Sequence, residues 1–121
     1  LVNPRDAWHS CASDFSNEYA GSFVTTEYIL LELGSLMARI SLRSLYVELI
    51  EGLQTHKTTR VIPTSPELFQ KGFRLFAERP DKILSITDCI SFVVMREEGL
   101  MEAATADHDF EQAGFRILLK R

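Results

Sequence analysis

An acidic segment near the end of the chain carries residue types that bind hard metal ions. The stretch TADHDFEQAG, residues 105–114, holds Asp107, Asp109 and Glu111, with His108 among them. Carboxylate oxygens are the ligands that Mg²⁺ and Mn²⁺ prefer in proteins. The same residues also suit a helix start, because Asp107 is a good N-cap and acids are favoured near the positive end of the helix dipole. The segment alone therefore allows a metal site or a capped helix.

A second acid, Asp88, opens an unusually apolar predicted helix. In the stretch SITDCISFVVM, residues 85–95, apolar side chains surround the helix almost completely, so it must be covered on nearly all sides. Asp88 lies on the side of Phe92 and Met95. A buried carboxylate is costly unless it is paired, hydrogen-bonded or metal-bound. The alternative is a capping box, in which Ser85 and Asp88 satisfy backbone N–H groups of the first turn.

A third acid, Glu32, lies at the border of an apolar helix face. That predicted face consists of Ile29, Leu33, Leu36, Met37 and Ile40. A boundary glutamate that keeps its carboxylate in water is the alternative to a ligand role. Carboxylates brought together raise one another's pKa unless a cation neutralises them. With no cysteine or histidine cluster to suggest zinc, the three acids together predict Mg²⁺ or Mn²⁺, the ions that serve phosphoester hydrolysis.

The elements that position these acids can be read from periodicity and from turn and capping residues. The first half of the chain predicts a turn at 3–6, a helix at about 7–19, a short strand at 22–25, and helices at about 27–40 and 42–53. Gly21 ends the first of these helices, and Thr25 or Thr26 caps the second. This half therefore predicts a strand flanked by helices.

The second half of the chain repeats the alternation of strands and helices. It predicts strands at 60–63, 103–105 and 116–119, and helices at about 66–78, 87–98 and 107–113. Gly99 and Gly114 end the last two helices. Short strands separated by helices indicate an α/β fold around a mostly parallel sheet. Ligands bind such sheets beyond the carboxyl ends of the strands, which is where Asp107 falls.

Composition narrows the class of protein. The 121 residues are 45% hydrophobic and 25% charged, which is typical of one globular domain. The net charge of −4 argues against a polyanion binder that works through bulk positive charge. Cys11 and Cys89 show no spacing pattern, which indicates two packed thiols in a reducing, cytoplasmic compartment. No apolar run is long enough for a membrane helix.

Four motifs, in this order and spacing, resemble the PIN-domain family, and within it the VapC-type toxins of VapBC toxin–antitoxin systems. The motifs are NPRDAWH (3–9), FVTTEYILLELGSL (23–36), LSITDCISFVVMREEGL (84–100) and TADHDFEQAGF (105–115). The resemblance implies a three-layer α/β/α sandwich with a central, mostly parallel sheet. It also implies a Mg²⁺- or Mn²⁺-dependent endoribonuclease that hydrolyses RNA phosphodiester bonds as the toxin of a type II pair.

The resemblance assigns a role to each acid. Glu32, Asp88 and Asp107 match the acids of the second, third and fourth family motifs, which implies that they are catalytic metal ligands. Asp109 is implied as a further ligand, direct or through water, because part of the family has a second acid there. Thr105 matches a hydroxyl that orients a carboxylate beside the metal.

The chain departs from the family pattern at its start. PIN domains open with a central apolar strand that ends in an aspartate, and Leu1 falls after that strand. Without it, the sheet would contain a gap of roughly 10 Å between neighbouring strands. Unpaired backbone edges make such a gap costly. Residues 1–121 are therefore expected to form a single PIN-like domain that lacks its first strand, with that strand and a fourth acid preceding Leu1 in the native protein.

The resemblance further implies a cognate antitoxin, a homodimer and a cytoplasmic location. Two other functions stay open: a catalytically silent PIN-like module that binds RNA or protein, and a PIN nuclease of RNA processing without an antitoxin. Arg39 and Arg43, one turn apart, could contact RNA or an antitoxin, and a solvated helix face is the alternative. His108 is expected to be an exposed neighbour of the cap, because hard-metal sites favour oxygen ligands.

Overall fold

Strands and helices alternate along the part of the chain that the computed structural model describes, residues 23–105 and 107–118. The elements, in order, are β1 (Phe23–Thr26), α3 (Glu27–Leu36), α4 (Ile40–Thr55), β2 (Thr59–Ile62), α5 (Pro66–Glu78), α6 (Ile86–Glu98), β3 (Glu102–Ala103), α7 (His108–Gln112) and β4 (Arg116–Ile117). The predicted turn at 3–6 and helix at 7–19 lie outside the described residues. Among the described helices, none combines the length and apolar character that crossing a membrane requires.

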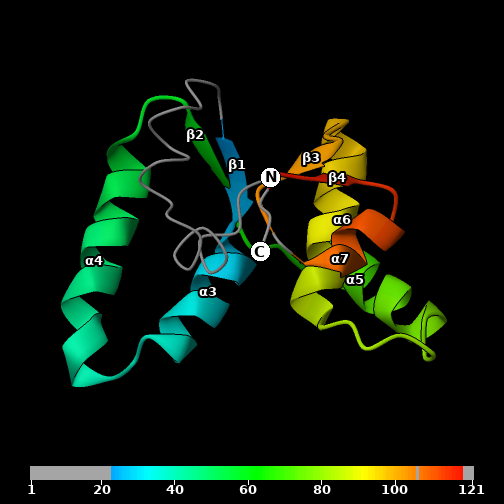
Figure 1. The fold of residues 1–121 in the computed structure, drawn as a ribbon, viewed down its shortest axis with the longest axis horizontal. Helices are drawn as coiled ribbons and strands as arrows, with labels where there is room; N and C mark the ends of the chain where they lie inside the picture. Colours follow the sequence, from blue (N-terminus) through cyan, green and yellow to red (C-terminus); the bar gives the residue numbers. More distant parts are fainter. Residues whose placement is uncertain (1–22, 106, 119–121) are drawn as a thin grey trace.

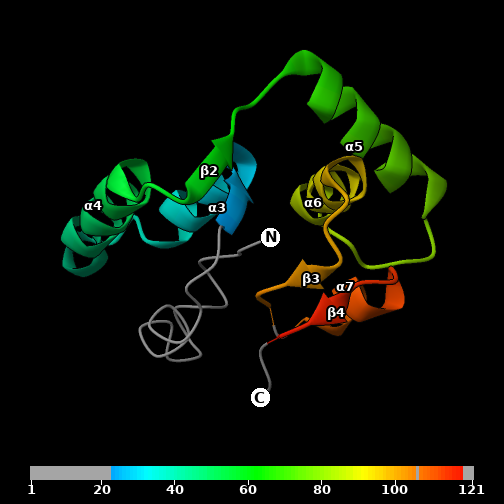
Figure 2. The ribbon, with the colours of Figure 1, turned by 90° about the horizontal axis from the view of Figure 1, so that it is seen from above.

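The described strands form two parallel pairs. β1 pairs with β2, and β3 pairs with β4. Figure 1 shows β1 as the strand of its pair that faces the β3–β4 pair, and Figure 2 shows β3 nearer to the β1–β2 pair than β4 is. Figure 2 shows α5 and α6 together on one side of the β3–β4 pair, while α3 and α4 lie beside the β1–β2 pair. Parallel strands joined by helical connections confirm the predicted α/β architecture.

The hydrophobic core centres on α6. The buried residues of this helix are Cys89, Ile90, Ser91, Phe92, Val94 and Met95. The Phe92 ring packs edge-on against Phe110 of α7, with centroids 4.8 Å apart, and stacks near Phe115 at 5.8 Å. Cys89 is a buried free thiol, as predicted, whereas Cys11 lies outside the described residues. The prediction that this helix is covered on nearly all sides is confirmed, and the core fixes the start of α6 in place.

Local capping explains where the helices begin and end. The Thr26 and Ser65 side chains accept backbone N–H groups at the starts of α3 and α5. The capping box predicted for Ser85 and Asp88 is present at the start of α6. Gly99 ends α6 in the left-handed conformation, with φ 68°, which glycine adopts without the strain of a Cβ atom. These signals need no tertiary contact, which is why the sequence reveals them.

The helix predicted over 27–40 is wrong in its last four residues. α3 ends at Leu36, and Ile40 instead opens α4. Leu36 and Ile40 are 53% and 90% exposed, although they were expected on the apolar face. The buried members of that face are Ile29, Leu33 and Met37. The chain turns at 37–39, so positions beyond the turn no longer follow the period of the first helix.

Gly72 allows α5 and α6 to pack closely. A Cβ atom at this position would clash with the Ile90 side chain and lie 3.2 Å from Ile90 Cα. We expect Gly72→Ala to lower the free energy of unfolding by about 1–3 kcal/mol, because the two helices must separate. Urea titration measures this change. The control is Gly52→Ala on α4, where a Cβ meets nothing within 4 Å and a gain of up to about 1 kcal/mol is expected. Equal changes in both variants would contradict the packing argument.

Candidate metal centre

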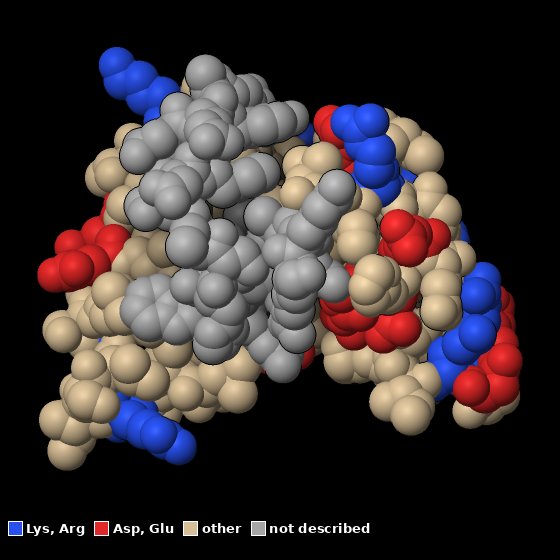
Figure 3. Space-filling model, in the orientation of Figure 1, with Lys and Arg blue, Asp and Glu red and all other residues tan. Residues whose placement is uncertain are grey.

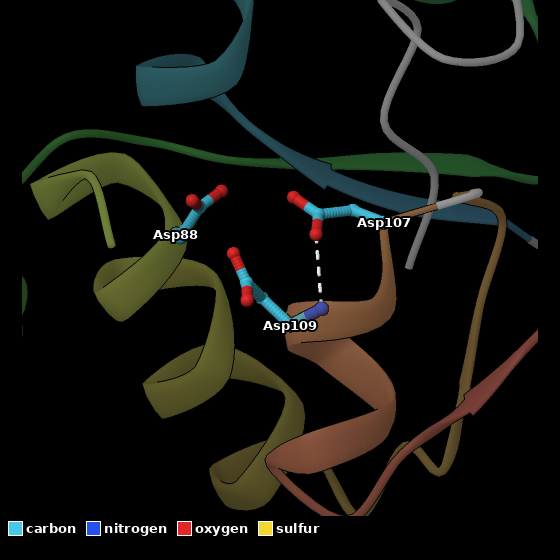
Figure 4. A group of neighbouring side chains, drawn as sticks. All are labelled: Asp88, Asp107 and Asp109. Carbon is cyan, nitrogen blue, oxygen red and sulfur yellow. Dashed lines mark hydrogen bonds between the residues drawn. The ribbon is translucent and has the colours of Figure 1, made fainter. Parts of the chain in front are cut away.

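Three carboxylates from α6 and α7 converge on one place. Asp88 lies in the first turn of α6, Asp107 is the N-cap of α7, and Asp109 follows in the first turn of α7. One oxygen atom from each residue lies within 4.8 Å of the others. Figure 4 shows the three side chains pointing toward one another across the space between the two helices. We call these three residues the acidic group.

Local hydrogen bonds hold Asp107 in position. Its Oδ1 atom accepts the backbone N–H of Asp109 at 2.9 Å, drawn as the dashed line in Figure 4. The buried Thr105 hydroxyl oxygen accepts the backbone N–H of Asp107 at 3.1 Å. Thr105 thus orients Asp107 through its backbone, and the carboxylate contact that the PIN resemblance implies for Thr105 stays a prediction. A carboxylate has two oxygens, so helix capping through Oδ1 is compatible with ligand binding through Oδ2.

Asp88 is both a helix cap and a member of the acidic group. Its Oδ2 atom accepts the Ser85 backbone N–H at 3.4 Å, and the Ser85 hydroxyl oxygen accepts the Asp88 N–H at 3.0 Å. Burial raises the pKa of the Asp88 carboxyl, the Ser85 hydrogen bonds lower it, and the charges of Asp107 and Glu32 raise it further. The net direction is upward, so the capping box does not compensate for the loss of water and the nearby negative charge.

Glu32 lies outside the acidic group but within its electrostatic reach. It is half-buried on α3, and its charge raises the pKa of Asp88. It does not belong to the set of oxygens within 4.8 Å of one another. The structure thus brings Glu32 near Asp88, and its role as a metal ligand stays a prediction.

Burial is the main cause of a raised pKa at Asp109. The charge of Asp107 and the hydrogen bond with it add to the rise, while the positive charges of Lys82 and His108 oppose it. A divalent cation would favour the charged form of both Asp88 and Asp109. The acidic group is therefore a set of hard oxygen donors whose negative charge is only partly offset by Lys82 and His108.

Asp109→Asn is expected to stabilise the metal-free protein. Because the pKa of Asp109 is raised in the folded state, the folded protein binds this proton more tightly than the unfolded chain does. The free energy of unfolding therefore falls as the pH rises above the ordinary value of 3.8. With a chelator at neutral pH, we expect Asp109→Asn to raise the melting temperature by about 2–4 °C, a gain that shrinks in acid. Glu111→Gln, at an exposed acid on the same helix, is the control and should change little. A lower melting temperature for Asp109→Asn at neutral pH would contradict this account.

Other predicted polar residues lie away from the acidic group. His108 is exposed, and its Nδ1 atom lies 3.5 Å from Glu111 Oε1. This placement agrees with an exposed neighbour of the cap. Arg39 and Arg43 are exposed, and Arg43 Nε donates to the Ala38 carbonyl at 2.7 Å. That bond favours the solvated helix face over a dedicated RNA contact.

The structure adds a basic pocket that the sequence did not reveal. It lies next to Asp109, and its basic members come from three places in the chain: Arg79 after α5, Lys82 in the following loop and Arg96 on α6. No spacing pattern links these residues. The sequence shows only that three basic residues occur within residues 79–96, and this does not show that their side chains share a surface.

Comparison with known proteins decides the family. A family model for the PIN domain matches residues 4–116, nearly the whole chain. The chain belongs to the PIN-domain family. The acidic group falls in the two motifs, 84–100 and 105–115, that carry the third and fourth acids of the PIN resemblance.

Relatives of this PIN domain include a characterised nuclease. The 23S rRNA-specific endonuclease VapC20 of Mycobacterium tuberculosis, found in two strains, is 26% identical over 115 residues, which cover 95% of this chain and 87% of the relative. The crystal structure of M. tuberculosis VapC20, a Sarcin-Ricin loop cleaving toxin, matches with a TM-score of 0.75 at 24% identity, covering 86% of this chain and 79% of that one. The α/β fold described above is thus the PIN fold.

Proposed function

We propose that this PIN-domain protein is a metal-dependent endoribonuclease that hydrolyses RNA phosphodiester bonds, as the toxin of a type II toxin–antitoxin pair. The observation that carries the proposal is the convergence of Asp88, Asp107 and Asp109 within 4.8 Å. Membership of the PIN family and the 26% sequence identity to a 23S rRNA-specific endonuclease support RNA as the substrate class.

The residues present fit a hard divalent cation. The acidic group offers carboxylate oxygens without thiol or imidazole ligands, which suits Mg²⁺ or Mn²⁺ better than zinc. Burial and mutual repulsion raise the pKa of Asp88 and Asp109, and a cation would offset both effects. We propose Asp88, Asp107 and Asp109 as ligands, with Glu32 as a further one. The bound ion would activate water and neutralise charge that develops on the phosphate.

The protein itself contributes pre-organisation. The Asp109 backbone N–H and the Thr105 hydroxyl hold Asp107, and the capping box holds Asp88, before any substrate arrives. Side chains fixed in this way need little reorganisation during the reaction, which is the condition for strong electrostatic stabilisation of a transition state.

A catalytically silent PIN-like module is the main alternative. In that case Asp88 and Asp107 would serve only as helix caps, a role that both do have. Capping does not require the Asp109 side chain, and it does not explain why three carboxylates share one half-buried place. The acidic group therefore favours the nuclease over the silent module.

Incubation of the native protein with 23S rRNA and other cellular RNA is the direct test. With Mg²⁺ or Mn²⁺ present, we expect discrete fragments whose ends primer extension can map. RNA binding without cleavage in either metal would favour the silent module and would overturn the nuclease proposal.

Following the VapC-type resemblance, we also propose that the protein acts in the cytoplasm and binds an antitoxin and a second copy of its own chain. Several apolar side chains of α3 and α4 are exposed and offer area that a partner could cover. They are Leu31, Leu36, Ile40 and Val47. The antitoxin proposal would be supported by a small adjacent gene whose product is a DNA-binding protein and co-purifies with the toxin. Its absence would favour a PIN nuclease of RNA processing.

A further parallel strand between β1 and β3 is part of the same proposal. Among the described residues, β1 pairs only with β2 and β3 only with β4, although both pairs are parallel. Also within the described part of the chain, the buried Thr25 hydroxyl of β1 has no hydrogen-bond partner. A strand from outside the described residues would join the two pairs into one sheet, and the PIN resemblance implies that it would add a fourth acid. Two separate strand pairs in a crystal structure of the native protein would contradict this proposal.

A further inference from the structure

A pocket of about 200 Å³ lies beside the acidic group, and Asp109 forms part of its wall. Three basic side chains line it: Arg79, the C-cap residue of α5, Lys82 in the loop, and Arg96 in the last turn of α6. Gln112 of α7 adds an amide. Positive charge thus adjoins the carboxylates on the same side of the domain, and Figure 3 shows acidic and basic side chains close together over α5 to α7.

The basic side chains of this pocket are available to an anion. All three are exposed, and within residues 23–105 and 107–118 none of them forms an ion pair with a carboxylate. By contrast, three basic residues elsewhere are each paired with a glutamate: Arg60, Lys71 and Arg116. Like charges gathered around one pocket repel one another, and a bound anion would relieve that repulsion.

The size and lining of the pocket limit what it can hold. Its volume is below the roughly 300–1,000 Å³ of sites for drug-sized ligands, so one phosphate or sugar-phosphate unit fits better than a whole cofactor. Apolar side chains complete the lining: Leu75, Leu84, Phe92 and Ala113. Apolar walls lower the local dielectric constant and strengthen the attraction between the basic groups and an anion.

We propose that Arg79, Lys82 and Arg96 bind a backbone phosphate of the RNA substrate, next to the phosphate that is cleaved at the acidic group. This inference rests on the proposed nuclease function and adds to it the residues that set the position of the RNA strand. It also explains how a chain with a net charge of −4 binds a polyanion, because the positive charge that matters is local.

The salt dependence of RNA binding tests the pocket separately from cleavage. Metal-free protein in chelator is titrated into a short fluorescein-labelled single-stranded RNA at several concentrations of salt between about 50 and 200 mM. For the double variant Arg79→Gln/Lys82→Gln we expect the Kd to rise about tenfold. The slope of log Kd against log salt should fall by up to about 0.7, because the pocket is proposed to neutralise one phosphate and each phosphate contact contributes about 0.7 for single strands. Arg96 is left unchanged, since its charge also stabilises the end of α6.

Matched variants show whether weaker RNA binding comes from a lost phosphate contact, from a general loss of positive charge or from unfolding. Arg74→Gln removes one exposed charge from α5 outside the pocket, so its slope should stay close to that of the wild type. Arg79→Lys/Lys82→Arg keeps both charges and should restore most of the slope. Inorganic phosphate should compete with RNA for the wild type and more weakly for the double variant. An unchanged slope in the double variant, or an equal decrease in Arg74→Gln, would overturn the proposal.

Cleavage in Mn²⁺ distinguishes failure of the pocket from failure of the nuclease function. In the double variant, KM should rise about tenfold while kcat changes little, because a phosphate contact away from the reacting atoms contributes binding that is equal in ground and transition states. If the wild type cleaves RNA and the double variant has the same KM, the pocket inference fails and the nuclease stands. If the wild type does not cleave but the slope decreases as expected, the pocket stands and the nuclease proposal fails.

Discussion

Asp107→Asn is expected to reduce RNA cleavage at least about a thousandfold, a loss of about 4 kcal/mol of transition-state stabilisation, while the fold stays intact. Asparagine caps helices as well as aspartate does, and its carbonyl oxygen can still accept the Asp109 N–H. What the substitution removes is the negative charge that a divalent cation needs. The variant therefore separates the two roles of Asp107, helix cap and proposed metal ligand.

The measurement is kcat/KM on a labelled RNA in Mn²⁺, with circular dichroism to verify the fold. Glu111→Gln is the matched control, because Glu111 is an exposed acid of the same helix and lies outside the acidic group. It should change kcat/KM by less than about twofold, since surface substitutions away from a site have small effects. Activity of Asp107→Asn within tenfold of the wild type would show that this carboxylate is not needed for cleavage.

Removal of divalent cations is expected to abolish cleavage and to lower the melting temperature. A ligand that binds only the folded state at a hundred times its Kd adds about 2.7 kcal/mol to the free energy of unfolding. Chelation of Mn²⁺ should therefore lower the melting temperature by several degrees, and added Mn²⁺ should restore both stability and activity. Thermal melts and cleavage assays with the same samples measure the two effects together.

Asp88→Asn tests whether that stabilisation originates at the acidic group. We expect the variant to lose most of the Mn²⁺-dependent rise in melting temperature, because one of the three converging carboxylates is gone. Asp81→Asn, at an exposed acid in the loop before α6, should keep the full rise. A rise of the same size in both variants would place the cation elsewhere on the protein.

The sequence predicts most of the helices because their ends depend on local chemistry. Ser65 followed by Pro66 marks the start of α5, and Ser85 with Asp88 marks the start of α6. Neither signal needs a distant contact. The end of α3 was mispredicted because the apolar residue Ile40 continues the helical period across a turn that only the folded chain reveals.

Part of the candidate site was also predictable, because two of its acids belong to helix starts that local chemistry determines. Asp88 and Asp107 each open a helix, and the α/β pattern brings their ends to one side of the domain. Asp109, which the resemblance gave only as a possible helper, lies within the acidic group, whereas Glu32 lies outside it.

The basic pocket could not be predicted, because it depends on how α5, α6 and α7 pack around the large core side chains. Arg79, Lys82 and Arg96 have no common period along the sequence, and only the packing of α5 on α6 brings them to one opening. The same packing buries Phe92 and Phe110 and so places α7, with its acids, against α6.

Diffraction from crystals of the native protein grown with Mn²⁺, recorded at the manganese absorption edge, tests the central claim most directly. We expect an anomalous peak at the acidic group from a Mn²⁺ ion coordinated by Asp88 and Asp107, with Asp109 as a ligand directly or through water. A protein that cleaves RNA in Mn²⁺ but shows no peak there, or shows its peak at other residues, would contradict the account.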